Sequence, residues 1–499
     1  MYFATIEPEC FWVIEMNIVH FGSNGWHARF DEALTPQALY SVALTLAHLY
    51  EAEKARSTIL VGYDTRSQSR MLAYVVAATM ADQGYSVRVL NYAVTTPMIS
   101  FMMSDSSYAL GIMLSGADYA GTYGGVVLRA RGGGLVAANI WSQLDGLVEQ
   151  TIPDETQQLI TALTNHEISL EDLDRTLVAS RQDARLLYKK EILAFVKNMA
   201  PHGLYRPLTV VLDYMHGATS GIAAELFEAL GCKVITTRQG ARDDFGGVHP
   251  CPIKPWTKHS YEVLRSAQAD VAVIYDGDGM RFSLIDNKAQ QVPLHLIAPC
   301  ILDFLVRFCG ERGRVVTTQA SSVRICRLAE QLNCETSIVP VGYARIADEL
   351  TEGDVLLACD EYAGICVPGF GIWRDGILAS LLVIRYLQMR NEGLHTIIAK
   401  MSSDLGNMDY IRKDLRLDPA KMQTFSTMLP GVNPASIAQK TPCAVSHADG
   451  LRLAFEDGSW IMLRPSRTQP TVRIYAEAPN LAERNELLRA AYALAQSKL

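Results

Sequence analysis

The chain has 499 residues, 49% of them hydrophobic, and a formal net charge of −8 at pH 7. This length accommodates three or four domains with buried cores, and the acidic balance argues against nucleic acid or an anionic membrane as a partner. No apolar run reaches the roughly 20 residues that span a bilayer. Glu7 and Glu9 stand where a signal peptide would be basic, so we expect a cytoplasmic protein.

Short apolar strands alternate with amphipathic helices along the first 400 residues or so, a pattern typical of α/β layers. The pattern occurs as three consecutive units of strands and helices. The predicted strands cover 58–62, 86–90, 109–114, 208–213, 233–236, 271–275, 315–317 and 355–359. The predicted helices cover 71–81, 221–230, 322–332 and 376–389. We therefore expect an α/β fold.

The last eighty residues or so follow a different pattern. Two predicted strands, 451–455 and 460–463, flank the turn sequence Glu-Asp-Gly-Ser at 456–459, which indicates a β-hairpin. A further strand is expected at 472–475 and a closing helix at 481–496. Because hairpin strands precede a single helix here, this part is predicted to be a smaller α+β domain.

The loop after the strand at 109–114 carries a family resemblance. Residues 111–113 read Gly-Ile-Met and residues 123–125 read Tyr-Gly-Gly. The segment resembles the α-D-phosphohexomutases, which include phosphoglucomutase and phosphomannomutase; there a G-I-M-I strand leads into T-A-S-H-N-P and then Y-N-G. In that family the serine carries the phosphoryl group. Counting inward from either flank places Ala117 at the serine position and Asp118 at the histidine position, and Ser115 lies two residues away as a weak substitute.

The resemblance extends over residues 18–499 and implies an architecture. It implies three similar α/β domains with mixed sheets and a C-terminal α+β domain, arranged around a central cleft. The expected domains are 1–165 with the nucleophile loop, 166–295 with the metal loop, 296–405 with the sugar-recognition loop and 406–499 with the phosphate-binding loop. Residues 1–15 have no counterpart in the family, so they are either an extension or precede a true start at Met16.

The expected metal loop reads Asp276-Gly-Asp278-Gly-Met280-Arg281. It resembles the family sequence D-G-D-x-D-R, whose three carboxylates hold Mg²⁺ together with the phosphoserine. Met280 replaces the third carboxylate. Because Mg²⁺ prefers hard oxygen ligands and a thioether is soft, Asp276 and Asp278 are expected to form a weak Mg²⁺ site at most, with Arg281 beside it as a substrate-binding residue.

Two further loops resemble binding elements of the family. Residues 359–364 resemble the sugar-recognition sequence G-E-x-S-G, with Glu361 at the glutamate and Ala363 at the serine; an acidic turn is the alternative interpretation. Residues 464–470 resemble the phosphate loop R-P-S-G-T-E-P. The candidate phosphate-binding residues are Arg464, Ser466, Arg467, Thr468 and Arg473; a structural turn that shapes the domain is the alternative interpretation.

His27 is a candidate substrate-binding residue, because it stands where the family has an arginine that serves the reacting phosphate. Taken together, the replaced residues are those that would touch that phosphate, whereas the scaffold segments remain. We therefore expect a non-catalytic relative that binds a hexose phosphate, another anionic small molecule or a protein partner. Two alternatives stay open. One is an enzyme with altered phosphosugar chemistry; the other is an active phosphoglucomutase or phosphomannomutase that uses Ser115 or a shifted loop.

Overall fold

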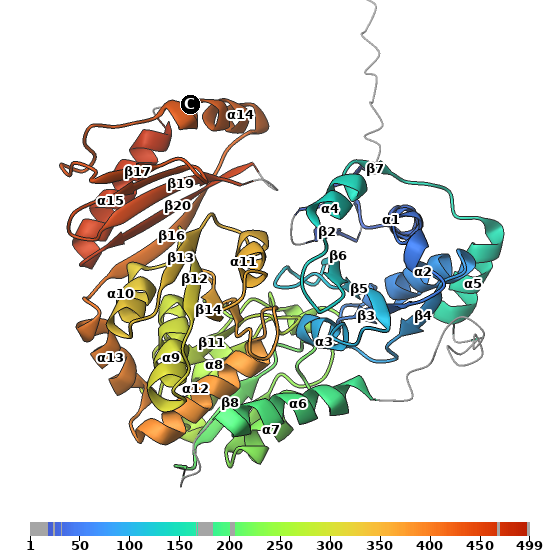
Figure 1. The fold of residues 1–499 in the computed structure, drawn as a ribbon, viewed down its shortest axis with the longest axis horizontal. Coiled ribbons are helices and arrows are strands. Elements are labelled where there is room, and N and C mark those ends of the chain that lie inside the picture. The colour runs from blue at the N-terminus through green and yellow to red at the C-terminus, as the bar shows by residue number, and fades with distance from the viewer. Residues whose placement is uncertain are drawn as a thin grey trace, which may run out of the picture.

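The computed structural model describes residues 18–22, 25–30, 32–165, 167, 183–199, 205–466 and 470–496. Figure 1 shows four sets of helices and strands that follow one another in chain order, with the first set at one side and the last at the opposite end. We refer to these sets as domains I to IV. The predicted extension at residues 1–15 lies outside the described residues.

Domain I contains a five-stranded mixed sheet in the order β2-β6-β5-β3-β4. The strands are β2 (Trp26–Arg29), β3 (Thr58–Tyr63), β4 (Ser86–Val89), β5 (Tyr108–Leu114) and β6 (Tyr123–Ala130). The helices are α1 (Pro36–Leu49), α2 (Ser69–Asp82), α3 (Thr96–Met102), α4 (Ala138–Leu144) and α5 (Asp154–Thr164), and the short strands β1 (Ile18–Val19) and β7 (Leu147–Val148) pair with each other. Strand β3 runs parallel to β4 and β5, whereas β5 and β6 are antiparallel.

Domain II repeats this plan with four strands in the order β11-β10-β8-β9. The strands are β8 (Thr209–Asp213), β9 (Lys233–Thr237), β10 (Val271–Tyr275) and β11 (Phe282–Ile285), and the helices are α6 (Ala184–Met199), α7 (Ala223–Ala229) and α8 (Lys258–Ala267). All five residues of β10 are buried, as expected for an apolar strand in the interior of a covered sheet.

Domain III has four strands in the order β13-β12-β14-β15. They are β12 (Arg314–Thr318), β13 (Thr336–Val339), β14 (Val355–Cys359) and β15 (Ile365–Cys366). The helices are α9 (Ile297–Asp303), α10 (Val323–Gln331), α11 (Tyr343–Leu350), α12 (Gly376–Arg390) and α13 (Leu394–Asp404). A turn of π-helix follows α9 at Phe304–Phe308.

Domain IV is built on an antiparallel sheet in the order β16-β20-β19-β18-β17. Its elements are β16 (Asp409–Arg416), α14 (Pro419–Met428), β17 (Ala444–Ser446), β18 (Leu451–Ala454), β19 (Trp460–Pro465), β20 (Thr471–Ala478) and α15 (Leu481–Gln496). The hairpin turn predicted at 456–459 joins β18 to β19. The predicted fold class, three α/β domains with mixed sheets and a C-terminal α+β domain, is confirmed.

Each of the first three domains places a loop at the same point of its repeat. A central strand that has a parallel neighbour ends, and the chain returns as an antiparallel strand: β5 to β6, β10 to β11 and β14 to β15. The three connecting loops are those in which the sequence predicted chemistry. In sheets of this kind, ligands bind beyond the carboxyl ends of parallel strands.

Buried contacts join domains I, II and III. One apolar cluster runs through domains II and III and includes Met98 and Ile99 of α3 in domain I. Domain IV has a separate core between its sheet and α15. Among the described residues, no helix is both long and apolar enough to cross a membrane. The exact domain bounds given above remain predictions.

Candidate functional site

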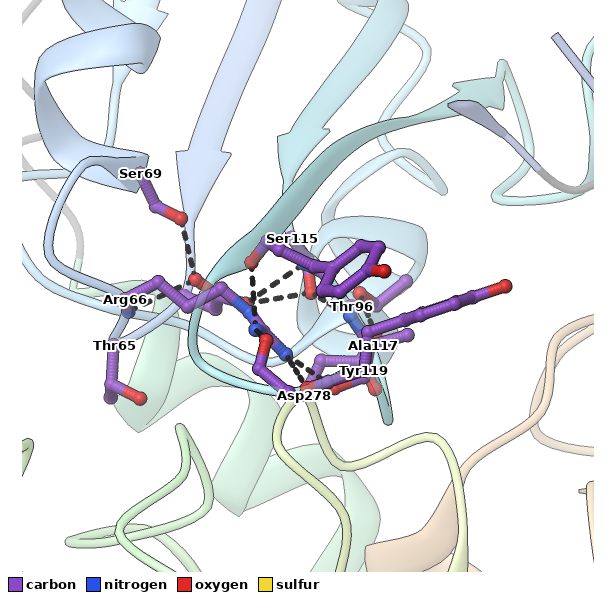
Figure 2. Close-up of polar contacts among 12 residues, drawn as sticks. Thr65, Arg66, Ser69, Thr96, Ser115, Ala117, Tyr119 and Asp278 are labelled. Carbon is purple, nitrogen blue, oxygen red and sulfur yellow. Dashed lines mark hydrogen bonds and ion pairs between the residues drawn. The ribbon is translucent and has the colours of Figure 1, made fainter. Parts of the chain in front are cut away.

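A buried ion pair holds the loop that follows β5. The Arg66 and Asp64 side chains are fully buried, with 2.9 Å between Arg66 Nε and Asp64 Oδ2. The two Nη atoms of Arg66 donate to backbone carbonyls of the loop, those of Ala117, Tyr119, Ala120 and Tyr123. Figure 2 shows Ser69, Arg66 and Ser115 close together; all three donate to the Asp64 carboxylate, Ser69 to Oδ1 and both Ser115 and Arg66 Nε to Oδ2.

Ser115 is part of this buried network. Its hydroxyl donates to Asp64 Oδ2 over 2.9 Å and accepts the backbone N–H of Ala117 over 3.0 Å, and none of the residue is exposed. Ala117, at the expected nucleophile position, is 5% exposed and has a left-handed backbone with φ of 47°. The only hydroxyl at positions 115–118, that of Ser115, is thus enclosed by protein. Ala117, which is slightly more exposed, carries a methyl group and no hydroxyl.

Asp118 points out of this network toward domain II. Its Oδ2 lies 3.0 Å from Arg281 Nη1 and 3.9 Å from the sulfur of Cys251. Burial by itself would raise the pKa of the Asp118 carboxyl, but opposing interactions, the largest of which is the charge of Arg281, lower the pKa overall. Asp118 therefore carries a negative charge at neutral pH and forms an ion pair with the arginine of the metal loop.

His27 lies on β2 beside the same loop. Its ring stacks on Tyr119 with 5.2 Å between the ring centres, and its buried Nε2 has no hydrogen-bond partner among the described residues. Burial lowers the pKa of the His27 imidazole to about 4. Where the family has an arginine, this chain therefore has an uncharged ring at neutral pH.

Asp276 and Asp278 lie together in the β10–β11 loop. Asp278 uses both carboxylate oxygens: Oδ2 accepts the Thr96 hydroxyl at 2.6 Å and Oδ1 accepts the Met280 N–H at 3.3 Å. Asp276 accepts the Arg281 N–H on Oδ1, while its buried Oδ2 has no partner among the described residues. Burial, together with the nearby Asp278 charge, raises the pKa of Asp276 well above its usual value.

Met280 is flanked by two buried arginines. Arg129 Nη2 and Arg374 Nη2 each lie 3.8 Å from the Met280 sulfur, and the two arginines are 3% and 4% exposed. Burial and the neighbouring Arg374 charge lower the pKa of Arg129 to about 10. Cations therefore surround the position at which the family has its third metal carboxylate.

This set of donors does not fit Mg²⁺. One of the two carboxylates has both oxygens engaged, the third donor is a thioether, and three guanidinium groups lie close by. In the part of the chain that the structure describes, no group of three or more His, Cys, Asp or Glu residues could hold a metal ion.

The β14–β15 loop places Glu361 at the border of domains III and IV. Glu361 is 8% exposed and accepts hydrogen bonds from Thr318 Oγ1 at 3.2 Å and from Tyr475 Oη at 3.4 Å. The Asp360 carboxylate turns back into its own loop, where it accepts the N–H groups of Tyr362 and Gly364 and pairs with Arg374. The Asp360 side chain therefore closes the turn.

The candidate phosphate residues of domain IV occupy different environments. Arg464 bonds through Nε to Asp449 and through Nη2 to the carbonyl of Val341, so it links domain IV to domain III. The Ser466 N–H bonds to the Thr471 carbonyl, which closes the loop. Arg473, on β20, forms no ion pair with a described residue, and its Nε has no hydrogen-bond partner among them. Arg467 and Thr468 lie outside the described residues.

The loops come together at one place, which we call the loop junction and define as residues 115–119, 276–281 and 360–364. A Cβ built on Gly277 would lie 2.7 Å from the Ala117 carbonyl oxygen, so the loops of domains I and II touch. Although burial disfavours the charge of Arg281, the carboxylates of Asp118, Asp360 and Asp276 outweigh it and raise its pKa. Arg473 of domain IV is close enough to lower the pKa of Tyr119, which burial otherwise raises.

Four consecutive family matches cover most of the chain. The phosphoglucomutase/phosphomannomutase alpha/beta/alpha domains I, II and III match residues 19–153, 188–289 and 295–403, and the C-terminal domain matches residues 420–494. The chain belongs to the phosphoglucomutase/phosphomannomutase family. Phosphoglucosamine mutase of Methanocaldococcus jannaschii is 25% identical over 483 residues, which cover 96% of this chain and 98% of the relative.

Other family members are similar over the same length. Phosphoglucomutase/phosphomannomutase of Thermococcus kodakarensis is 23% identical and covers 96% of this chain and 99% of its own length. A solved structure of a family protein from Burkholderia thailandensis has a TM-score of 0.72 at 18% identity, covering 96% of this chain and 97% of its own. N-acetylphosphoglucosamine mutase of Aspergillus fumigatus, solved with GlcNAc-6P and magnesium, has a TM-score of 0.58 at 12% identity, covering 97% and 96%.

Several residues that shape the site were not identified from the sequence. Thr96 holds Asp278, Arg129 contacts Met280, and Asp449 holds Arg464. Each contact joins residues of different domains or strands, and none of the three residues lies in a loop that resembles the family's motifs. A pattern search over one chain offers no signal for such partners.

Proposed function

We propose that this phosphohexomutase-family protein binds a hexose phosphate at the loop junction and does not transfer a phosphoryl group through a serine. The main support is the state of the loop after β5. Ala117 offers no acceptor oxygen, and the Ser115 hydroxyl is fully buried and bonded to Asp64. A nucleophile must reach the reacting atom in an aligned position, and a displacement of about 1 Å can already cost about a hundredfold in rate.

The surroundings support the same proposal. Phosphoryl transfer depends on cations that neutralise the charge developing on the reacting phosphate. Here the imidazole of His27 is neutral, and the guanidinium of Arg281 is paired with Asp118. Binding of one sugar phosphate needs fewer functional groups than phosphoryl transfer does. Glu361, which accepts the Tyr475 hydroxyl, is available for sugar hydroxyls, and Arg473, which is near Tyr119, is available for the phosphate.

An active mutase is the second candidate, and the full-length similarity to proteins named as mutases favours it. Two measurements on the purified protein distinguish the two candidate functions. The purified protein is incubated with glucose 1,6-bisphosphate and its intact mass is measured, and a coupled assay follows conversion of glucose, mannose and glucosamine 1-phosphates. We expect no added phosphoryl group and no turnover above background. Turnover near 1 per second, within the usual enzyme range, would refute the proposal.

Mapping of any phosphorylated peptide decides which residue accepts the group. A phosphoryl group on Ser115 would favour the mutase with a substitute serine. Mass addition that persists in Ser115→Ala would indicate another acceptor. A relative that carries the family's serine loop serves as the positive control for the reagents.

Magnesium binding gives a separate prediction. Because the third ligand is Met280 and guanidinium groups surround it, titration calorimetry with MgCl₂ should show no binding in the micromolar range. The same relative, with three carboxylates in its metal loop, is the control. Micromolar affinity in the unmodified protein would contradict this prediction and show that these residues do form a Mg²⁺ site.

A further inference from the structure

The Asp118–Arg281 pair lies at the accessible side of the loop junction. The side chains of Asp118 and Arg281 are 30% and 21% exposed, with 3.0 Å between the paired atoms. Around them, the Asp64–Arg66 pair is fully buried. A ligand that enters the loop junction from solvent therefore meets the Asp118–Arg281 pair before it meets any of the buried charges.

Three other arginines near this pair are engaged mainly by protein groups. The donors of Arg66 are used by Asp64 and by backbone carbonyls. Arg129 and Arg374 are buried around Met280, and Arg374 also pairs with Asp360. An incoming phosphate that pairs with Arg281 would therefore lie beside the Asp118 carboxylate, whether it displaced Asp118 from Nη1 or bonded to the Arg281 Nε, which has no hydrogen-bond partner among the described residues.

Asp118 is well placed to resist that exchange. A carboxylate and a phosphate oxygen compete for the same guanidinium donors. If the phosphate displaced Asp118, the freed carboxylate would remain a few ångströms away as a like charge at a partly buried position, where screening by water is weak. Repulsion of this kind excludes one ligand while leaving another unaffected.

The domain IV end differs. Arg473 on β20 has no ion-pair partner among the described residues, and it is close enough to Tyr119 of domain I for its charge to lower the Tyr119 pKa, which burial raises. Glu361 lies near this end, since Tyr475 on the same strand β20 donates to it. One end of the loop junction thus has Arg473, which lies opposite Asp414 of β16 but forms no ion pair with a described residue, and the other end has an internal anion.

We propose that Asp118 is a built-in anion that occupies the phosphate-accepting position at Arg281, so that the loop junction accepts a hexose with one phosphate, held at the Arg473 end, and rejects a hexose bisphosphate. This inference rests on the proposed function and specifies its ligand. The unphosphorylated end of the sugar then faces Asp118 and Tyr119, whose carboxylate and hydroxyl suit sugar hydroxyls.

Calorimetric titration without added metal tests the proposal with glucose 1-phosphate, glucose 6-phosphate and glucose 1,6-bisphosphate. In the unmodified protein, the bisphosphate should bind at least ~10-fold more weakly than the better monophosphate. Asp118→Asn keeps the shape and removes the charge; it should raise bisphosphate affinity at least ~10-fold and change monophosphate affinity by less than ~3-fold. The double variant Asp118→Asn/Arg281→Gln should lose that gain. Glu32→Gln, an exposed carboxylate of domain I, controls for the change in net charge.

Inorganic phosphate serves as a second probe, and Asp118→Ser as a second variant if Asp118→Asn does not fold. A gain of bisphosphate or phosphate affinity that depends on Arg281 supports the built-in anion, even if no monophosphate binds the unmodified protein and the proposed function fails. Equal affinity of the unmodified protein for mono- and bisphosphate overturns the inference. So does an Asp118 variant, folded by its thermal midpoint, that gains no anion affinity.

Discussion

Ala117 and Ala363 have left-handed backbones, with φ of 47° and 56°. They occupy the equivalent loops of domains I and III, and both are nearly buried. A residue with a Cβ loses about 1–2 kcal/mol in this conformation, and glycine does not. The folded loops therefore impose the conformation on both alanines, and backbone strain of this kind is concentrated at functional sites.

Glycine at either position should relieve that strain. Ala117→Gly and Ala363→Gly are expected to leave stability unchanged or raise it by up to ~1 kcal/mol, because the relieved strain offsets the larger entropy of the unfolded chain. Ala43→Gly, in the middle of helix α1, should instead lower stability by at least ~1 kcal/mol. Chemical denaturation of the three variants measures this. A loss at positions 117 and 363 equal to that at position 43 would contradict the argument.

Removal of the Arg66 side chain should be severe. Arg66→Gln would leave the buried Asp64 carboxylate without its cation and free four loop carbonyls. Breaking a buried ion pair on one side costs about 3–5 kcal/mol. We expect a clear drop in the thermal midpoint and faster proteolysis within residues 117–123. Arg70→Gln, at an exposed position four residues away, is the control; a similar drop there would mean that Arg66 has no special role.

At the scale of elements, the buried N-cap of α12 gives a pH-dependent prediction. Asp375 accepts the N–H groups of Ile377 and Leu378 and the hydroxyl of Tyr188 on α6. Burial raises the pKa of Asp375 to about 6, although these hydrogen bonds lower it. The folded state thus binds more protons than the unfolded state between about pH 4 and 6, so this group makes stability fall as pH rises through that range.

Asp375→Asn keeps a good N-cap and removes the titration. Relative to the unmodified protein, the variant should gain stability by up to ~3 kcal/mol as pH rises from 4 to 6, at ~1.4 kcal/mol for each pKa unit. Thermal midpoints across this range provide the measurement. Asp418→Asn, at the exposed N-cap of α14, is the matched control. A constant difference between Asp375→Asn and the unmodified protein at all pH values would exclude the buried charge as the cause.

Elements with a clear apolar pattern, either a continuous apolar strand or an amphipathic helix, were the easiest to predict. The strands expected at 271–275 and 355–359 coincide with β10 and β14, and the helix at 481–496 coincides with α15. The two-residue strand β15 and the π-helix at Phe304–Phe308 were not predicted. Both are too short for a periodic pattern, and tertiary contacts decide their conformation.

The site was predictable only where motifs are contiguous. The loop around Asp276 could be identified because its residues are adjacent in the chain. The two arginines around Met280 come from positions 151 and 94 residues away. Their contacts depend on how three domains pack, and no local pattern encodes that. For the same reason, no local pattern indicated that Arg464, a predicted phosphate-binding residue, links domains III and IV.

At the scale of the whole molecule, His295 contributes to the junction of domains III and IV. Its Nε2 lies 2.8 Å from Nη2 of Arg324, which in turn donates to the carbonyl of Met408 at the start of domain IV. Burial and the Arg324 charge lower the pKa of His295 to about 3. Protonation would place two cations side by side between the domains, because the nearby Asp409 is already paired with Arg484.

This arrangement should make the protein sensitive to mild acid. Because the folded pKa of His295 lies below its unfolded value, the unfolded state binds more protons between about pH 3 and 6.5. The stabilisation is complete above pH 6.5 and is lost as the pH falls, by up to ~3 kcal/mol at pH 4. His27, whose pKa is about 4, acts in the same direction. His295 therefore lowers the thermal midpoint as the pH falls from 6.5 to 4, whereas Asp375 acts in the opposite direction below about pH 6, so the measurement compares the pH dependence of variants with that of the unmodified protein. His295→Gln, which still offers Arg324 an acceptor, should fall less steeply, whereas His447→Gln at an exposed position should follow the unmodified protein. Parallel curves for all three proteins would show that His295 does not contribute to the acid response.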